Sequence, residues 1–225
     1  MRVILFDIDG TLIRCGGAGG GALERAIGQV LGHEHAISLR LAGRTDRAII
    51  SEAVRGIGHD PDERFDEIRD RYLSTLDEEL DRRDGGVLPG VVDLLERLRA
   101  SGDSVLGLLT GNFRRGAEIK LRHFGLADYF DWDAAAFGDD RLDRNDVARD
   151  AFGRASARFA GPVLEPADVC IVGDTPNDVR CGRAIGARVV AVATGDFDQD
   201  ALRETGPDHL LPDLTAAGPW ADIAG

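Results

Sequence analysis

Two acidic residues, Asp7 and Asp9, directly follow a short apolar run near the start of the chain. The apolar residues 3–6, followed by a turn signal at Gly10, predict a buried strand at residues 3–7. In parallel α/β sheets, ligands bind at the carboxyl ends of the strands. Burying two carboxylates there costs free energy unless they hold a metal or take part in a reaction. The pair therefore marks a candidate site for catalysis or metal binding.

Further apolar runs along the chain alternate with stretches of helical periodicity. Strands are expected at residues 104–110, within 129–137, at 167–172, at 188–193 and, as a short sixth one, at 209–211. Helices are expected at residues 91–99, 113–124, 145–159 and 176–185. Strands that alternate with helices in this way predict an α/β fold with a doubly wound parallel sheet.

Polar side chains follow several of these expected strands. They are Thr110 and Asn112 after the second strand, Asp139, Asp140, Arg141 and Arg144 after the third, and Asp174 and Asp178 after the fourth. Because parallel strands end at one edge of the sheet, these groups can converge with Asp7 and Asp9. One carboxylate could then attack phosphorus while a second transfers protons. A hydroxyl and backbone N–H groups could hold phosphate oxygens, a cation could balance their charge, and other carboxylates could bind Mg²⁺.

Residues 16–85 interrupt this alternation, because they carry helical patterns and no convincing strand. Apolar residues recur at helical spacing over residues 22–31, 45–55 and 62–82. Residues 16–21 include five glycines, which predicts a flexible hinge or a close backbone approach. We therefore expect a core formed by residues 1–15 and 86–225, and a helical cap formed by residues 16–85.

Three segments together resemble the motifs of the haloacid dehalogenase superfamily of phosphohydrolases. Residues 7–12 (Asp-Ile-Asp-Gly-Thr-Leu) match the pattern D-x-D-G-T-[LV]. Residues 108–112 match a strand that ends in Ser or Thr, and residues 173–178 (Gly-Asp-Thr-Pro-Asn-Asp) match G-D-[ST]-x-x-D. Their order, spacing and strand context agree over the whole chain.

The resemblance implies a fold and a role for each motif residue. The fold implied is a Rossmann-like core with a mobile helical cap inserted after the first strand. Asp7 is implied as the nucleophile and Asp9 as the general acid and base. The phosphoryl-binding residues implied are Thr110, Gly111 and Asn112. The Mg²⁺ ligands implied are Asp7, the backbone carbonyl of Asp9, Asp174 and, in support, Asp178.

The sequence departs from the family pattern at one cation. The family usually has a Lys, less often an Arg, before the helix that precedes the last motif, and this chain has Asp-Arg-Asn-Asp at residues 143–146. We expect Arg144 to supply the charge, with Arg141 as the alternative. A guanidinium stays charged and can contact phosphate and carboxylate together. Lys120, the only lysine of the chain, is expected to be a solvated charge on its helix.

The composition restricts the partners and the location of the protein. The chain has 225 residues and a net charge of −13, which argues against nucleic acid and anionic membranes as partners. It has no apolar run near the ~20 residues needed to span a bilayer, and no signal peptide is evident. Three cysteines without paired spacing fit reduced thiols in the cytoplasm. The partner expected is a small phosphorylated metabolite, bound by a monomer or homodimer.

The function expected is Mg²⁺-dependent hydrolysis of a phosphomonoester through an aspartyl phosphate. Among the members of the superfamily, the chain most resembles those like phosphoglycolate phosphatase, because of its small helical cap and the cap segment at residues 43–46 (Gly-Arg-Thr-Asp). Arg44 in this segment could bind a carboxylate or second phosphate of the substrate, or the segment could simply cap a helix. A phosphosugar mutase-like member and a non-catalytic relative that binds a phosphorylated metabolite stay open as alternatives.

Overall fold

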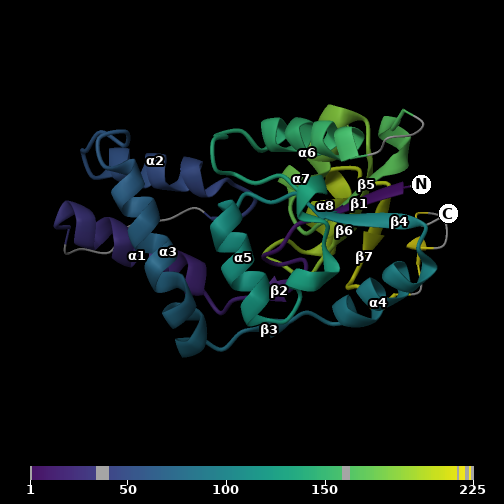
Figure 1. Ribbon diagram of the computed structural model, residues 1–225, viewed down its shortest axis with the longest axis horizontal. Helices are drawn as coiled ribbons and strands as arrows, with labels where there is room; N and C mark the ends of the chain where they lie inside the picture. The colour runs from purple at the N-terminus through teal and green to yellow at the C-terminus, as the bar shows by residue number, and fades with distance from the viewer. Residues whose placement is uncertain (1, 34–40, 159–162, 217, 221–222, 224–225) are drawn as a thin grey trace.

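The centre of the molecule is a parallel five-stranded sheet with the strand order β4-β1-β5-β6-β7 (Figure 1). It is seen in a computed structural model that describes residues 2–33, 41–158, 163–216, 218–220 and 223. The strands are β1 (Arg2–Phe6), β4 (Ser104–Leu108), β5 (Val169–Gly173), β6 (Arg188–Val192) and β7 (His209–Leu211). β1 pairs in parallel with β4 on one side and with β5 on the other. The predicted α/β fold with a parallel sheet is confirmed.

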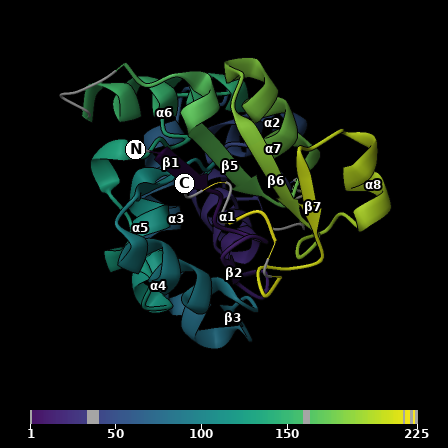
Figure 2. The same ribbon diagram turned by 90° about the vertical axis from the view of Figure 1, so that its right-hand side faces the viewer.

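Helices cover both faces of this sheet (Figure 2). They include α4 (Val91–Ser101), α5 (Arg114–His123), α6 (Arg144–Arg158) and α7 (Pro176–Ile185). The side chains of β1 alternate between the faces: Ile4 and Phe6 join the apolar cluster that contains α4 and α5 residues, whereas Val3 and Leu5 join the one that contains α6 and α7 residues. All four are fully buried. Packing on both faces fixes β1, and with it the residues that follow.

Three further helices lie to one side of the sheet (Figure 1). They are α1 (Ala18–Leu31), α2 (Asp46–Gly56) and α3 (Phe65–Arg82). A small antiparallel sheet that the sequence did not indicate, β2 (Ile13–Arg14) with β3 (Gly86–Val87), joins the two ends of this helical segment. That residues 16–85 form a separate, mobile domain stays a prediction. No helix among the described residues is long and apolar enough to cross a membrane.

The predicted flexible glycine hinge is wrong for four of its six residues, because residues 18–21 belong to α1. Gly19, Gly20 and Gly21 lie inside α1, and only Gly16 and Gly17 have positive φ angles, of 57° and 83°. A Cβ on Gly19 would lie 3.4 Å from Lys120 Nζ. The absence of a side chain at Gly19 therefore leaves room for the end of the Lys120 side chain, which comes from α5.

The strand predicted within residues 129–137 is also wrong. The segment forms two 3₁₀-helices, Ala127–Tyr129 and Trp132–Ala134, and a single parallel bridge from Ala136 to Leu109. Asp131 caps the second turn by accepting a hydrogen bond from the Asp133 backbone N–H (3.0 Å). This turn takes the chain out of register with β4.

The other predicted elements are present with small shifts at their ends. Phe159, where the fourth core helix was expected to end, lies outside the described residues. One short helix, α8 (Gln199–Glu204), was not predicted.

Candidate active site

Asp7 follows β1 at the carboxyl edge of the sheet and is 4% exposed. Its backbone N–H donates to the carbonyl of Val172 in the neighbouring β5 (2.9 Å), so the residue is still held by the sheet. Its carboxylate Oδ1 lies 3.0 Å from Arg144 Nη2. Burial raises the pKa of Asp7 to about 6, although the charge of Arg144 opposes this shift. Asp7 is thus a desolvated carboxylate held in place by one cation.

Arg144 begins α6, and its side chain is 6% exposed. Besides Asp7, its Nη2 contacts Asp178 Oδ1 at 2.6 Å, while its buried Nε has no hydrogen-bond partner among the described residues. Burial would lower the pKa of Arg144, but the Asp178 and Asp7 carboxylates outweigh burial and raise it. Arg141 is exposed instead and pairs with Asp150 at 2.8 Å. The structure therefore brings Arg144 to Asp7 and leaves Arg141 outside.

Asp174 and Asp178 complete an acidic cluster beside Asp7. Asp174 follows β5, and its Oδ1 accepts a hydrogen bond from the Thr11 hydroxyl at 2.9 Å. Asp178 lies in the first turn of α7, where its Oδ2 accepts from the Thr175 backbone N–H (2.9 Å) and hydroxyl (2.7 Å) in a capping box. Burial and the charges of Asp178 and Asp7 raise the pKa of Asp174 well above its usual value.

This cluster fits a magnesium ion. One oxygen each of Asp7, Asp174 and Asp178 lies within 4.8 Å of the others, and Mg²⁺ prefers such oxygen ligands. Two glycines make room for the Asp174 carboxylate, because a Cβ on Gly10 would lie 2.4 Å from its Oδ2 and one on Gly195 would lie 1.7 Å from it. Asp178 already uses both oxygens, on Arg144 and Thr175. Asp7 and Asp174 therefore fit as direct ligands, and Asp178 fits as support.

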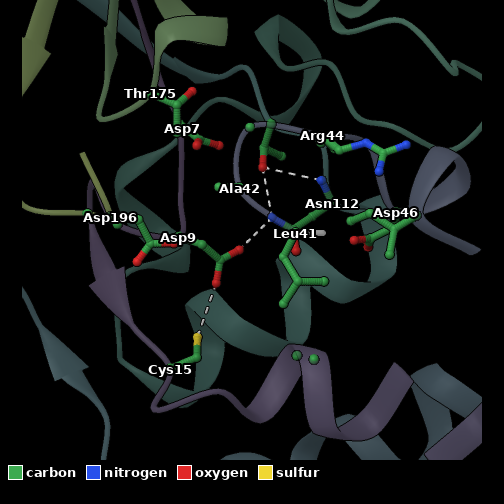
Figure 3. Close-up of a pocket in the computed structure, with 18 of the residues that line it drawn as sticks. Asp7, Asp9, Cys15, Leu41, Ala42, Arg44, Asp46, Asn112, Thr175 and Asp196 are labelled. Carbon is green, nitrogen blue, oxygen red and sulfur yellow. Dashed lines mark hydrogen bonds between the residues drawn. The ribbon is translucent and has the colours of Figure 1, made fainter. Parts of the chain in front are cut away.

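Asp9 contacts a different set of residues from Asp7, although only Ile8 lies between them in the sequence. Gly10 has a φ of 85°, which lets the chain turn sharply away from the sheet. Asp9 Oδ2 accepts hydrogen bonds from Asn112 Nδ2 (2.8 Å) and Lys120 Nζ (2.6 Å). Its Oδ1 accepts from Cys15 Sγ at 3.3 Å (Figure 3). The Asp9 side chain is 42% exposed, because it opens into a pocket.

The prediction that Lys120 is a solvated charge is wrong. Lys120 is 4% exposed on α5, and its Nζ also donates to Asn112 Oδ1 at 2.7 Å. The same helix face buries Ala117 and Leu121, so Lys120 interrupts an apolar stripe. Two signals in the sequence could have identified it: its place in this stripe, and its being the only lysine among 27 Lys and Arg residues.

The surroundings shift the two carboxylates in opposite directions. Burial would raise the pKa of Asp9, but the Lys120 charge and the hydrogen bonds from Lys120, Asn112 and Cys15 outweigh it, so the pKa of Asp9 is lowered. Burial would likewise lower the pKa of Lys120, but Asp9 reverses this and the pKa is raised. Asp9 and Lys120 therefore form an ion pair. Without substrate, Asp9 is therefore the more acidic of the two carboxyl groups.

Thr110 and Asn112 lie in the loop between β4 and α5. The buried Thr110 Oγ1 accepts hydrogen bonds from the Asn112 backbone N–H (3.3 Å) and side-chain Nδ2 (2.8 Å). Because both bonds use the oxygen as acceptor, the hydroxyl can still donate to a phosphate oxygen. Asn112 thus connects Thr110 to Asp9.

Residues 41–46 of the helical segment cover this loop from the opposite side. A Cβ on Gly111 would lie 1.9 Å from the Arg44 carbonyl oxygen, and the Asp46 backbone N–H donates to the Gly111 carbonyl at 2.7 Å. The Arg44 guanidinium pairs with Glu52 at 2.6 Å and extends away from Asp9 (Figure 3). Its predicted role in substrate binding stays a prediction. The carboxyl edge of the sheet and the helical segment together line a cavity of about 320 Å³.

A comparison of the sequence with models of protein families leads to the same family as the three motifs. A model of the haloacid dehalogenase-like hydrolases matches residues 1–186. The chain belongs to the haloacid dehalogenase-like hydrolase family. The match covers the sheet edge with Asp7, Asp174 and Asp178 as well as the helical segment above it.

Curated relatives of this haloacid dehalogenase-like hydrolase include phosphatases. Phosphoglycolate phosphatase 1 of Pseudomonas aeruginosa is 33% identical over 140 residues, which are 61% of this chain and 48% of that protein. The bifunctional riboflavin kinase/FMN phosphatase of Arabidopsis thaliana is 28% identical over 196 residues, 84% of this chain and 48% of that protein. The chain thus spans about half the length of these relatives. The phosphoglycolate phosphatase of Rhodospirillum rubrum is 26% identical over 97% of this chain and 90% of its own.

Solved structures of the family share the fold. CbbY from Rhodobacter sphaeroides, in complex with phosphate, has a TM-score of 0.76 at 19% identity, over 97% of this chain and 96% of its own. A predicted phosphoglycolate phosphatase from Haemophilus somnus has a TM-score of 0.68 at 19% identity, over 100% of this chain and 98% of its own.

Proposed function

We propose that this chain is an Mg²⁺-dependent phosphatase that hydrolyses the phosphomonoester of a small metabolite through a phosphorylated Asp7. The observation that carries the proposal is the buried Asp7 carboxylate, 3.0 Å from Arg144 Nη2 and clustered with Asp174, with Asp9 opening into the same pocket. The phosphatases among the relatives support the same activity. The natural substrate does not follow from them.

In the first step, an oxygen of Asp7 attacks the phosphorus of the ester. A bond forms between this oxygen and phosphorus, and the bond from phosphorus to the ester oxygen breaks. The leaving oxygen takes a proton from the Asp9 carboxyl group, which becomes a carboxylate. Before substrate binds, Lys120 favours the charged form of Asp9. A phosphate dianion beside Asp9 opposes this effect and favours the protonated form that the step requires.

In the second step, Asp9 acts as a base. It takes a proton from a water molecule, whose oxygen attacks phosphorus while the bond between phosphorus and Asp7 breaks. Inorganic phosphate leaves, and Asp7 is a carboxylate again. The ion pair with Lys120 suits this step, because it stabilises the Asp9 carboxylate before the proton transfer.

The other residues bind and neutralise the phosphoryl group. The Thr110 hydroxyl and the Gly111 backbone N–H can donate hydrogen bonds to its oxygens, and Arg144 balances negative charge beside Asp7. Asp7, the backbone carbonyl of Asp9, and Asp174 would hold Mg²⁺, with Asp178 in support. When bound, the ion supplies charge that reduces the repulsion between the Asp7 carboxylate and the phosphate.

The test is release of p-nitrophenol from its phosphate ester by the purified protein, with Mg²⁺ and with EDTA. We expect turnover only with Mg²⁺, and we expect Asp7→Asn to abolish it without loss of the folded circular dichroism spectrum. Asp9→Asn should still be phosphorylated, because p-nitrophenol needs little protonation to leave, but should release phosphate slowly. Intact mass spectrometry after an acid quench detects this phosphoprotein.

Two outcomes would contradict the proposal. Activity retained by Asp7→Asn would exclude Asp7 as the nucleophile. No turnover of p-nitrophenyl phosphate or of any phosphorylated metabolite in a panel would instead favour a protein that only binds such a ligand.

A further inference from the structure

Asp46 places a buried carboxylate in the wall of the pocket that faces the catalytic residues. It is the first residue of α2, is 9% exposed, and lines the same cavity as Asp7, Asp9 and Lys120. Its Oδ2 accepts a hydrogen bond from the Phe113 backbone N–H at 2.9 Å. Among the described residues, Asp46 forms no ion pair. In Figure 3 its carboxylate points into the pocket from the side opposite Asp7.

The contact with Phe113 alone does not account for a charge at this position. Together with the bond from the Asp46 backbone N–H to the Gly111 carbonyl, it joins the helical segment to the core. A neutral asparagine could accept the same hydrogen bond from Phe113 with its amide oxygen. Burial raises the pKa of Asp46 to about 6, which means that the charged form is costly here. The hydrogen bond to Phe113 therefore does not by itself require a charge at this position.

The other groups around Asp46 offer little to an anionic leaving group. The Lys120 ammonium already contacts Asp9 at 2.6 Å, and the Arg44 guanidinium contacts Glu52 at 2.6 Å. Leu23, Leu41 and Ile49 add apolar surface to the lining of the same pocket. A leaving group that extends from Asp9 toward α2 thus meets an acceptor carboxylate and hydrocarbon.

We infer that Asp46 selects the substrate by accepting a hydrogen bond from its leaving group. The preferred substrates are then phosphate esters of small alcohols that carry a second donor, a hydroxyl or an ammonium group. Esters with a second carboxylate, such as phosphoglycolate, are disfavoured, because two negative charges would face each other in a desolvated pocket. The inference rests on the proposed phosphatase activity and names its substrate class.

The experiment compares three two-carbon esters in the presence of Mg²⁺: 2-hydroxyethyl phosphate, phosphoethanolamine and phosphoglycolate. They share a skeleton and differ only in the second group. For the wild type we expect kcat/KM to be at least about tenfold higher for one of the two donor esters than for phosphoglycolate. The comparison between 2-hydroxyethyl phosphate and phosphoethanolamine identifies the donor as hydroxyl or ammonium.

Asp46→Asn tests the residue itself. The amide oxygen can keep the bond to Phe113, while the NH₂ group turns a donor toward the substrate. We expect the ratio of kcat/KM between the donor ester and phosphoglycolate to fall about tenfold or more. Asp139→Asn is the matched control, because Asp139 Oδ2 accepts from the Arg114 backbone N–H (2.8 Å) at the same end of α5 and does not line the pocket. This variant should leave the ratio unchanged.

The outcomes separate this inference from the proposed function. Preference of the wild type for phosphoglycolate would overturn the inference and leave the phosphatase intact, and it needs no variant to fold. An equal loss on all three esters in Asp46→Asn would also overturn it, because Asp46 would then serve only to join the helical segment to the core. Absence of hydrolysis of these esters and of p-nitrophenyl phosphate would overturn both.

Discussion

Arg144 is the buried cation beside the proposed nucleophile, and its loss should be severe. Its Nη2 lies 3.0 Å from Asp7 and 2.6 Å from Asp178, so Arg144→Ala leaves two buried carboxylates without their cation. Removing one partner of a buried ion pair typically costs about 3–5 kcal/mol of stability. We expect kcat/KM for p-nitrophenyl phosphate to fall by two or more orders of magnitude, and the melting temperature to fall as well.

The alternative cation provides the control for Arg144. Arg141 is exposed and pairs with Asp150 outside the pocket, so Arg141→Ala should retain nearly all activity. Arg144→Lys should recover part of the loss, because a lysine keeps the charge but cannot contact Asp7 and Asp178 with a planar group. An active Arg144→Ala with an inactive Arg141→Ala would reverse the assignment.

Lys120 should matter most for esters that need a proton to leave. It fixes the Asp9 carboxylate together with Asn112, so Lys120→Met releases Asp9 from the position where it meets the ester oxygen. We expect a larger loss of kcat for alkyl phosphates than for p-nitrophenyl phosphate, whose leaving group needs little protonation. Steady-state kinetics with the two ester types measures this. Equal losses on both would assign Lys120 to folding alone.

At the residue scale, the sequence predicted the groups that lie in contiguous motifs. Asp7, Asp174 and Thr110 could be placed because each follows a strand, and the ends of parallel strands share one edge. Lys120 and Asp46 could not be placed in this way. Lys120 lies in the middle of α5, and Asp46 is the first residue of α2. They reach the same pocket only because the start of α2 contacts the loop that precedes α5. That packing is tertiary: the apolar stripe of α5 indicates that Lys120 is buried, but local spacing does not identify its partner.

At the scale of elements, prediction succeeded where local chemistry decides the structure. The start of α7 is an example, because Thr175, Pro176 and Asp178 form a capping signal that is visible in the sequence and present in the structure. The segment at residues 129–137 is the opposite case. Its apolar residues do pack beside β4, but Asp131 caps a 3₁₀ turn that breaks the pairing. Apolar content alone does not distinguish these outcomes.

Gly111 tests whether the helical segment must dock on the loop after β4. A Cβ at this position would lie 1.9 Å from the Arg44 carbonyl oxygen, a backbone atom that cannot move aside alone. We expect Gly111→Ala to displace residues 41–46 and to lower kcat/KM for p-nitrophenyl phosphate by about tenfold or more, as misplacement of a site by an ångström can do.

Gly153 in α6 provides the control for this substitution. A Cβ there would meet no atom within 4 Å, so Gly153→Ala should keep the activity and raise stability by roughly 0.5–1 kcal/mol through its higher helix propensity. Full activity of Gly111→Ala would show that this contact is not needed for turnover.

At the scale of the whole molecule, the helical segment and the core share one apolar cluster. Phe113 of the core loop makes edge contacts with Phe65 and Tyr72 of α3, each at 6.1 Å between ring centroids. Both rings belong to the same cluster as Ile4 and Phe6 of β1. The contact between the helical segment and the core thus buries apolar surface next to the pocket. It also leaves Asp46 and Lys120 largely shielded from solvent. The stability of the molecule is therefore coupled to the charges that its pocket contains.

Asp46 makes this coupling measurable as a pH dependence of stability. Burial raises its pKa in the folded protein from 3.8 to about 6. Between these values the folded state binds more protons than the unfolded state, so this group lowers the stability as the pH rises from about 4 to above 6. Asp46→Asn removes the titrating group. In EDTA, its melting temperature should exceed that of the wild type by a few degrees at pH 7.5. The difference should be clearly smaller at pH 4.5, where Asp46 is neutral in the folded protein and its carboxyl is charged only in the unfolded protein. A variant that is less stable at pH 7.5, or a difference that does not change with pH, would mean that the Asp46 charge is stabilised by its surroundings.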